Sequence, residues 1–498
     1  MSSQALREAR RYEEIYGKRI LPEQRPLFHL TPRTGWMNDP NGFCRYGGMY
    51  HLFYQYYPYS SIWGPMHWGH AVSGDLLHWE YLPAALAPDE FYDQDGCFSG
   101  SALTLDDGRH LLMYTSVIMR SQPDGRRREL QTQSIAVGDG TYYSKYEGNP
   151  VLDSKDLPAG SDPRDFRDPK MWREMDGTYR CVVSSRIADA GGDSRLLLFR
   201  SSDGFQWEFE KILITNGLRF GRMWECPDFF ELDGKQVLLV SPQDMEPKGF
   251  EYHNGNGTLC LIGDYDRETA DFRPQYDQAI DYGIDFYAPQ TILTPDGRRV
   301  MIGWMQNWDA CAIRDPEAEW AGQMSTPREL SVRDGRLYQQ PIRELDLCRR
   351  NRVEHLDVHL TKERMYLDGV RGRVVDMEIR VRPADPEKSY QKFVLRFAED
   401  GETYTSLRFR PSESTLKIDR KFSGSRRAIV HQRRCYVENA QEELRFRVIL
   451  DRNSCEVFID GGRKVMSAAL YTDLSAEQIS FRADGDVVMD IVKYDLIV

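Results

Sequence analysis

Short apolar runs, each preceded by a two-residue turn signal, dominate the first two thirds of this chain of 498 residues. The runs at 49–56, 111–117, 178–185, 237–241 and 300–305 are rich in aliphatic and aromatic residues, as buried strands are. They follow Gly47-Gly48, Asp107-Gly108, Asp176-Gly177, Asp233-Gly234 and Asp296-Gly297. Because such pairs readily adopt the positive φ of a tight turn, each is predicted to close a β-hairpin.

The five turns recur at a nearly regular spacing. Their second glycines lie at 48, 108, 177, 234 and 297, which is too far apart for one hairpin and about the length of a four-stranded sheet. Five repeated units of this kind predict a five-bladed β-propeller. The fold class is therefore expected to be all-β.

The pattern changes after about residue 340. Apolar and polar residues alternate at 416–418 and 444–448, as they do in half-exposed antiparallel strands, and Asp400-Gly401, 451–454 and Asp460-Gly461 are turn signals. We expect a β-sandwich of about 140 residues. The predicted limits are an N-terminal extension at 1–25, a propeller at 26–340, a linker at 341–355 and a sandwich at 356–498.

Three carboxylates occupy related places in the repeat. Counting back nine residues from each second glycine gives Asp39, Ser99, Asp168, Glu225 and Ala288. If the strand before each hairpin is the innermost of its blade, all five positions open onto one end of the central channel. The carboxylates are then expected to converge although they are distant in sequence.

Each carboxylate also lies in a short motif: WMNDPNG at 36–42, FRDPK at 166–170 and WECPD at 224–228. Alone, each motif is more typical of a structural turn, and Arg167 is expected to keep Asp168 ionised by its charge. Together they fit glycoside hydrolysis, in which one carboxyl protonates the leaving oxygen and another attacks the anomeric carbon or activates water.

With FSGSA at 98–102, these motifs resemble in order those of the invertase and fructanase family, glycoside hydrolase family 32, from about Arg25 to Val498. The resemblance implies a five-bladed propeller with a C-terminal sandwich. It implies that Asp39 is the nucleophile, Glu225 the general acid and base, and Asp168 a stabiliser of the transition state. The fructose-binding residues that it implies are Asn38, Gln55, Trp63, Phe98, Ser99, Arg167 and Trp304.

Composition narrows the classes of function. The formal net charge of −12, without a basic tract, disfavours nucleic acid and anionic membranes as partners. Nine scattered cysteines predict reduced thiols, and the charged first twenty residues lack the apolar core of a secretory signal. We expect a cytoplasmic enzyme with a small sugar substrate, no cofactor and no metal. Assembly of several copies through the sandwich is a further expectation.

The main hypothesis is a retaining β-fructofuranosidase acting on sucrose and short fructo-oligosaccharides, with the carboxyls of Asp39 and Glu225 about 5–5.5 Å apart. A sucrose-6-phosphate hydrolase is the nearest alternative. The loop at 59–67 beside the expected pocket carries no lysine or arginine, which favours an unphosphorylated substrate. The same motifs are also compatible with a non-catalytic sugar-binding propeller and with a fructosyl transferase.

Overall fold

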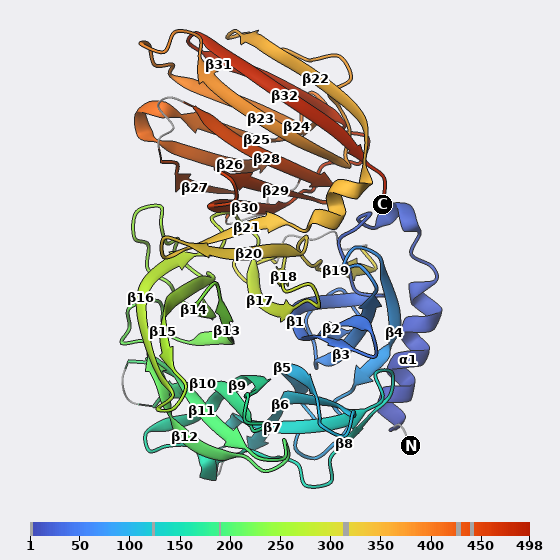
Figure 1. The fold of residues 1–498 in the computed structure, drawn as a ribbon. Coiled ribbons are helices and arrows are strands. Elements are labelled where there is room, and N and C mark those ends of the chain that lie inside the picture. Colours follow the sequence, from blue (N-terminus) through green and yellow to red (C-terminus); the bar gives the residue numbers. More distant parts are fainter. Residues whose placement is uncertain (1–2, 122–124, 189–190, 312–317, 425–429, 439–442) are drawn as a thin grey trace.

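Five β-sheets arranged around a central axis form the N-terminal part of the molecule (Figure 1). The computed structural model describes residues 3–121, 125–188, 191–311, 318–424, 430–438 and 443–498. In each sheet the strand that precedes the predicted turn is the first of the blade, and it pairs with the strand that follows the turn. The predicted five-bladed propeller is therefore confirmed.

The blades follow one another along the chain. The first contains β1 (Gly35–Tyr46), β2 (Met49–Tyr57), β3 (His67–Ser73) and β4 (Trp79–Leu86), and the second contains β5 (Gly96–Thr104), β6 (His110–Ser121), β7 (Arg127–Gly138) and β8 (Tyr143–Lys145). The third contains β9 (Ser161–Arg173), β10 (Tyr179–Ile187), β11 (Ser194–Ser201) and β12 (Glu208–Thr215). The fourth contains β13 (Trp224–Leu232), β14 (Lys235–Pro242), β15 (Leu259–Asp266) and β16 (Asp271–Ala279), and the fifth contains β17 (Tyr287–Leu293), β18 (Arg299–Trp304), β20 (Arg328–Arg333) and β21 (Arg336–Pro341).

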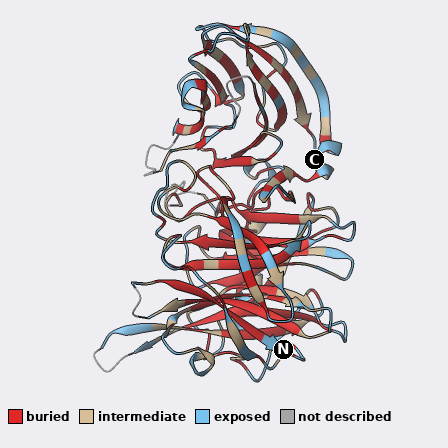
Figure 2. Cartoon of the chain, turned by 60° about the vertical axis from the view of Figure 1, so that its left-hand side comes forward, coloured by how far each residue is buried: buried red, intermediate tan, exposed pale blue. Residues whose placement is uncertain are grey.

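A short strand closes the ring. β19 (Trp320–Ala321) follows β18 in the chain but pairs in parallel with β1, so a segment from the end of the propeller is hydrogen-bonded to its beginning. The strands that line the centre are mostly buried, whereas exposed residues gather at the outer edges (Figure 2).

Two further sheets pack face to face as the predicted sandwich. One contains β22 (Arg349–Leu360), β32 (Val487–Leu496), β23 (Val375–Pro383), β28 (Leu444–Asp451), β29 (Ser454–Ile459) and β30 (Lys464–Ala469). The other contains β27 (Gln432–Tyr436), β26 (Thr415–Phe422), β25 (Tyr404–Arg410), β24 (Lys392–Glu399) and β31 (Gln478–Asp484). β22 begins inside the segment 341–355 that we expected to be a linker, directly after the short 3-10 helix Arg343–Cys348.

The N-terminal extension is an ordered part of the propeller. Helix α1 (Gln4–Gly17) runs beside β4 (Figure 1), and the buried Glu13 accepts a hydrogen bond from the backbone N–H of Ala84 at 2.9 Å. Leu6 packs into the core of the first blade. Within the described residues, no helix is long and apolar enough to cross a membrane.

Each inner strand carries a bulge, which lies near the start of every strand except β9, where it lies near the middle. The pairing of the inner strand with its neighbour shifts register between Met37 and Pro40 in β1, and at the corresponding places in β5, β9, β13 and β17. A bulge inserts an unpaired residue and redirects side chains away from the regular alternation. Two neighbouring side chains of an inner strand can thereby face the end of the channel.

The bulges correct one detail of the predicted repeat. Asp168, Cys226 and Ala288 all have positive φ and all precede a proline, so Cys226 and not Glu225 is the equivalent of Asp168. The count from the turn missed this by one residue because the chain between the bulge and the turn is shorter in β13. β1 contains a second register shift, between Asn41 and Cys44, and β9 and β17 end in longer turns, at 174–178 and 294–298.

Candidate active site

A pit of about 560 Å³ opens at the end of the channel where the inner strands begin. All five blades contribute to it, and its volume is within the usual range of small-molecule sites. The residues that line it are Asn38, Asp39, Gln55, Trp63, Phe98, Ser99, Glu129, Gln131, Asp165, Arg167, Asp168, Glu225, Gln243, Asp244, Asn256 and Trp308. The three carboxylates expected to converge thus line one cavity.

Asp39 has one oxygen held by the protein and one oxygen without a partner. Its Oδ2 accepts a hydrogen bond from the Ser99 hydroxyl at 2.8 Å and from the Cys226 thiol at 3.4 Å. Its Oδ1 is buried and makes no hydrogen bond with the described residues. Burial and the nearby charge of Glu225 raise the pKa of Asp39 to about 6, against the opposing effect of the Ser99 hydrogen bond. At neutral pH the carboxylate form prevails.

Asp168 is fixed by its backbone as well as by its side chain. Its φ of 63° is uncommon for a residue with a Cβ, and strain of this kind is often found at functional sites. The freed backbone N–H donates to the Thr115 hydroxyl at 2.9 Å, and Oδ2 accepts from the backbone N–H of Cys226 at 2.9 Å.

The pKa of Asp168 is higher than expected from the charge of its neighbour Arg167. Burial raises its pKa, the charge of Arg167 lowers it, and the charge of Glu225 raises it again, with a net result of about 7. Arg167, whose Nε lies 3.9 Å away, favours the ionised form of Asp168, but burial outweighs its effect, so the expectation that Arg167 keeps Asp168 ionised is wrong.

Both oxygens of Glu225 have donors. Tyr287 donates its hydroxyl hydrogen to Oε2 at 2.6 Å, and Arg167 Nε donates to Oε1 at 3.1 Å. Arg167 is in turn held by Asp165, at 2.5 Å. The side chain of Glu225 keeps 15% of its surface exposed, so it is fixed in direction but open to the pit.

Six of the seven predicted sugar-binding residues line the pit. The Trp36 indole donates to Asn38 Oδ1 at 2.8 Å, and Gln55 Nε2 donates to the carbonyl of Cys97 at 3.1 Å. Trp63, which is 45% exposed, stands edge-on to Phe98 with ring centroids 5.9 Å apart. These rings offer apolar surface to a sugar next to polar groups that can orient it.

Trp304 is the exception. It is fully buried behind the pit, where its ring packs against Trp36 and Trp308, and Trp308 lines the cavity in its place. Trp304 is the last residue of β18, whereas Trp308 lies in the loop beyond it and so reaches the mouth.

Sequence reasoning missed Tyr287, although a signal was present. Asn38, Arg167, Glu225 and Tyr287 each stand two residues before a proline on an inner strand. Three of these four were assigned to the site, so the fourth could have been found from the same pattern. Glu129, Asp244 and Asn256 had no such signal because they come from other strands and loops, and Asp165 had none because it lies on β9 but outside this pattern.

Comparison with known protein families gives two adjoining matches. The model for the N-terminal domain of glycosyl hydrolases family 32 matches residues 29–341, and the model for the C-terminal domain of that family matches residues 344–496.

Curated relatives match over nearly their whole length. A raffinose invertase of Escherichia coli is 35% identical over 93% of this chain and 93% of its own. A sucrose-6-phosphate hydrolase of Zymomonas mobilis is 36% identical over 96% and 93%, and one of Bacillus subtilis is 32% identical over 97% of both chains.

Solved structures agree with these matches. A family 32 β-fructofuranosidase of Bombyx mori has a TM-score of 0.83 and 35% identity, covering 100% of this chain and 99% of that one. A sucrose-6-phosphate hydrolase of Lactobacillus gasseri has a TM-score of 0.82 and 27% identity, covering 100% and 97%.

Proposed function

Because the chain belongs to glycosyl hydrolase family 32 and is a glycoside hydrolase of fructosides, we propose that its pit releases the terminal β-D-fructofuranosyl unit of unphosphorylated sucrose and short fructo-oligosaccharides. The observation that carries the proposal is the meeting of Asp39, Asp168 and Glu225, from three different blades, around one cavity of sugar size.

The surroundings of the carboxylates suit a double displacement. Asp39 Oδ1, which has no partner among the described residues, attacks the anomeric carbon while Glu225 gives its proton to the glycosidic oxygen, and the bond to the leaving sugar breaks. Glu225 then takes a proton from water, which attacks the same carbon and releases Asp39. The configuration is retained because that carbon is inverted twice.

Asp168 accepts hydrogen bonds from the sugar hydroxyls. These bonds strengthen as positive charge develops on the ring in the oxocarbenium-like transition state. The bulge around Asp168 and the hydrogen bond from Cys226 fix the position of this carboxylate before substrate arrives, which limits the reorganisation needed during the reaction.

The charge of the pit favours an unphosphorylated leaving sugar. In the part of the chain that the structure describes, its lining contains six carboxylates but one arginine, Arg167, which is already bound by Asp165 and Glu225. A phosphate carries about two negative charges at neutral pH and is normally bound by free arginine or lysine side chains. Sucrose 6-phosphate is the second candidate, because several relatives are named for its hydrolysis.

Turnover of sucrose, sucrose 6-phosphate, 1-kestose and inulin by the same preparation tests the proposal. We expect kcat/KM for sucrose to exceed that for sucrose 6-phosphate by about tenfold or more, which is about 1.4 kcal/mol of electrostatic discrimination. A preference for the phosphorylated sugar contradicts the substrate assignment, and no release of fructose from any of them contradicts the enzyme assignment. Analysis of the products at high sucrose concentration measures how much fructose is transferred to another sugar and how much is released by hydrolysis.

A cytoplasmic location is part of the proposal. The nine cysteines all lie within the described residues, where none forms a disulfide and seven are buried, as is typical of proteins from a reducing compartment. Fractionation of the producing cells, with activity measured in each fraction, tests this assignment. Activity confined to the medium contradicts it.

A further inference from the structure

The loop that follows β14 reaches from the catalytic pit to the sandwich. We call residues 243–258 the fourth-blade loop. Asp244, near its start, and Asn256, near its end, both line the pit. Between them the backbones of Met245 and Gly255 pair, so the loop is a narrow hairpin whose two ends lie at the pit.

The sandwich holds the far part of this hairpin through strand β27. Arg433 donates to Oδ1 and to the backbone carbonyl of Asn254, at 3.3 and 3.2 Å. Nearer the tip, the ring of Phe250 packs against that of Tyr436, with centroids 5.1 Å apart. The contact made by Arg433 is therefore only two residues along the chain from Asn256, which lines the pit.

Asn256 is also bound to the neighbouring loop of the fifth blade. We call residues 305–311 the fifth-blade loop, and its Trp308 lines the pit as well. The backbone N–H and Nδ2 of Asn256 donate to the carboxylate of Asp309 at 2.8 and 3.0 Å, and Asn307 Nδ2 donates to the carbonyl of Asn256 at 2.7 Å. The two loops thus form one hydrogen-bonded wall.

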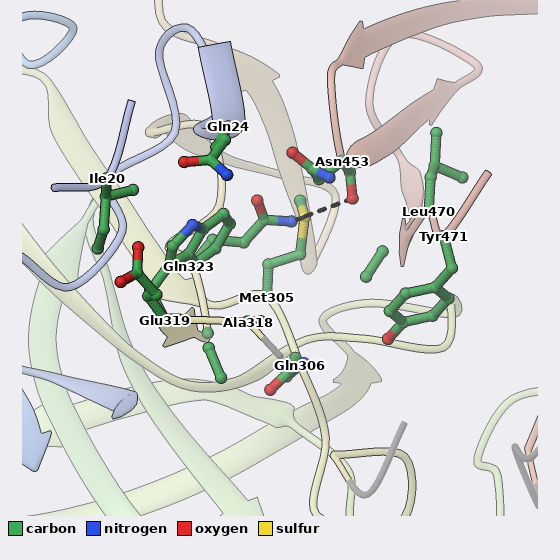
Figure 3. Close-up of a pocket in the computed structure, with 14 residues that line it drawn as sticks. Ile20, Gln24, Met305, Gln306, Ala318, Glu319, Gln323, Asn453, Leu470 and Tyr471 are labelled. Atoms are coloured by element: carbon green, nitrogen blue, oxygen red, sulfur yellow. Dashed lines mark hydrogen bonds between the residues drawn. The ribbon is translucent and has the colours of Figure 1, made fainter. Parts of the chain in front are cut away.

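The fifth-blade loop begins at the boundary with the sandwich as well. Figure 3 shows this boundary, with Gln306 on the propeller side and Tyr471 on the sandwich side. The backbone N–H of Met305 donates to the carbonyl of Gln323 at 2.8 Å, and Gln323 Nε2 donates to the backbone carbonyl of Asn453 at 3.4 Å. Both halves of the wall are therefore connected to the sandwich.

This wall lies beside the proposed general acid. Glu225 on β13 pairs with Ser241 on β14, and Asp244 of the fourth-blade loop follows three residues later. In the proposed reaction Glu225 gives its proton to the glycosidic oxygen, so the groups next to it face the leaving sugar. Contacts of the leaving sugar with this wall then contribute to the choice between substrates that share the same fructosyl unit.

We propose that Arg433 is a positioning residue for the leaving sugar. By holding Asn254 it fixes Asn256, and through Asn256 the wall that the two loops form, so the sandwich takes part in substrate selection. The proposal rests on the function proposed for the pit. Arg433 is not among the described residues that line the pit, so it acts through the loop and not by touching the substrate.

Arg433→Leu in the intact chain tests the proposal with two substrates, sucrose and methyl β-D-fructofuranoside. Both contain the same fructosyl unit, but methanol is too small a leaving group to reach along the wall. We expect kcat/KM for sucrose to fall by about five- to tenfold, mainly through a higher KM, because a binding wall is displaced. The value for methyl β-D-fructofuranoside should stay within about twofold. Arg433→Lys, which keeps a cationic donor, should recover part of the loss.

The matched control is Arg410→Leu, an exposed arginine on β25 of the same sheet that is paired with Glu413, and it should change neither value. A thermal melt shows whether each variant is folded, and Asn254→Ala, which removes one acceptor of Arg433, decides the matter if Arg433→Leu does not fold. An unchanged ratio between the two substrates overturns the proposal, and so does an equal loss on both, which would mean general damage to the pit. If the parent protein releases fructose from neither substrate, the function proposed for the pit fails instead.

Discussion

Neighbouring carboxylates in the pit have different hydrogen-bond partners, which suits the distinct roles that we propose for them. Asp39 keeps one oxygen free, Glu225 has donors on both oxygens, and Asp168 is bound through a strained bulge. The pKa of Asp39 is raised to about 6 and that of Asp168 to about 7, chiefly by burial. Asp39 and Asp168 must both lose their protons before the proposed nucleophile and the proposed stabiliser are charged, so kcat/KM should fall as the pH drops through about 7 to 6.

Asp39→Asn should abolish turnover. The amide cannot form the ester intermediate, so kcat for sucrose should fall by about 10³-fold or more. The folded state should be kept, because asparagine has the same shape and can still accept from Ser99. Initial rates and a thermal melt measure the two effects. If the activity of Asp39→Asn is within a few fold of that of the parent protein, Asp39 is not the nucleophile.

Ser99→Ala should move the acidic limb of the rate profile to higher pH. The Ser99 hydroxyl stabilises the charged form of Asp39 at 2.8 Å, so its loss raises the pKa of that carboxyl further above 6. A hydrogen bond to a charged group contributes about 1.5 kcal/mol, which corresponds to about one pH unit.

The pH dependence of kcat/KM measures that shift. Ser101→Ala is the control, since Ser101 lies on the same strand but donates to the carbonyl of Pro169. If the acidic limb of the pH–rate profile stays in place in Ser99→Ala, or moves equally in both variants, the hydrogen bond from Ser99 does not set the pKa of Asp39.

At the level of elements, the sequence revealed the hairpins but not the bulges. The five turns could be predicted because Gly-Gly and Asp-Gly act locally, through the φ that they permit. The bulges and the exact length of each turn depend on how a strand pairs with its neighbour, and the assignment of Glu225 to the repeat was therefore one residue off. The carboxylate pattern could not reveal Tyr287, because the fifth blade carries Ala288 where the first and third carry Asp39 and Asp168.

Helix α1 supports the loop that carries Trp63. Tyr12 on the helix stands edge-on to Tyr59, with centroids 5.0 Å apart, and donates to the Tyr59 carbonyl at 3.4 Å. Trp63 lies four residues further along the same loop and lines the pit. The predicted N-terminal extension therefore contributes indirectly to the substrate site.

Tyr12→Ala should weaken substrate binding more than chemistry. Loss of the contact frees the loop that carries Trp63. KM for sucrose should then rise by about three- to tenfold, because Trp63 is expected to bind the sugar. kcat should stay within about twofold, because the carboxylates that carry out the reaction keep their positions. Steady-state kinetics measure both constants. Glu14→Ala, an exposed position on the same helix paired with Lys18, is the control and should change neither. Unchanged KM in Tyr12→Ala contradicts the supporting role.

Across the whole molecule, buried charges join the two domains. His29 of the propeller contacts Asp451 at 2.8 Å and Glu456 at 3.1 Å, and Arg328 contacts Glu456 at 2.6 Å. Burial alone would lower the pKa of His29, but the two carboxylates raise it to about 9. The sequence could predict both domains, but not this interface, because the partners of His29 are more than 400 residues away.

In His29→Gln, the free energy of unfolding should no longer fall as the pH rises into the alkaline range. The pKa of His29 is higher in the folded state than its unfolded value of about 6.5, so its contribution is complete below that pH and is lost as the pH rises through 9. The parent protein should lose about 3 kcal/mol between pH 6 and pH 10 from this group. Urea unfolding at both values measures it. An equal loss in His29→Gln contradicts the assignment.

We propose that Asp39 and Glu225 act from opposite sides of one sugar and that a covalent intermediate forms on Asp39. Hydrolysis of sucrose in the presence of methanol tests it most directly, because the methyl fructofuranoside that forms does not change configuration and can be assigned by NMR. We expect methyl β-D-fructofuranoside, the product of two displacements. Formation of the α-anomer requires a single displacement and would contradict it.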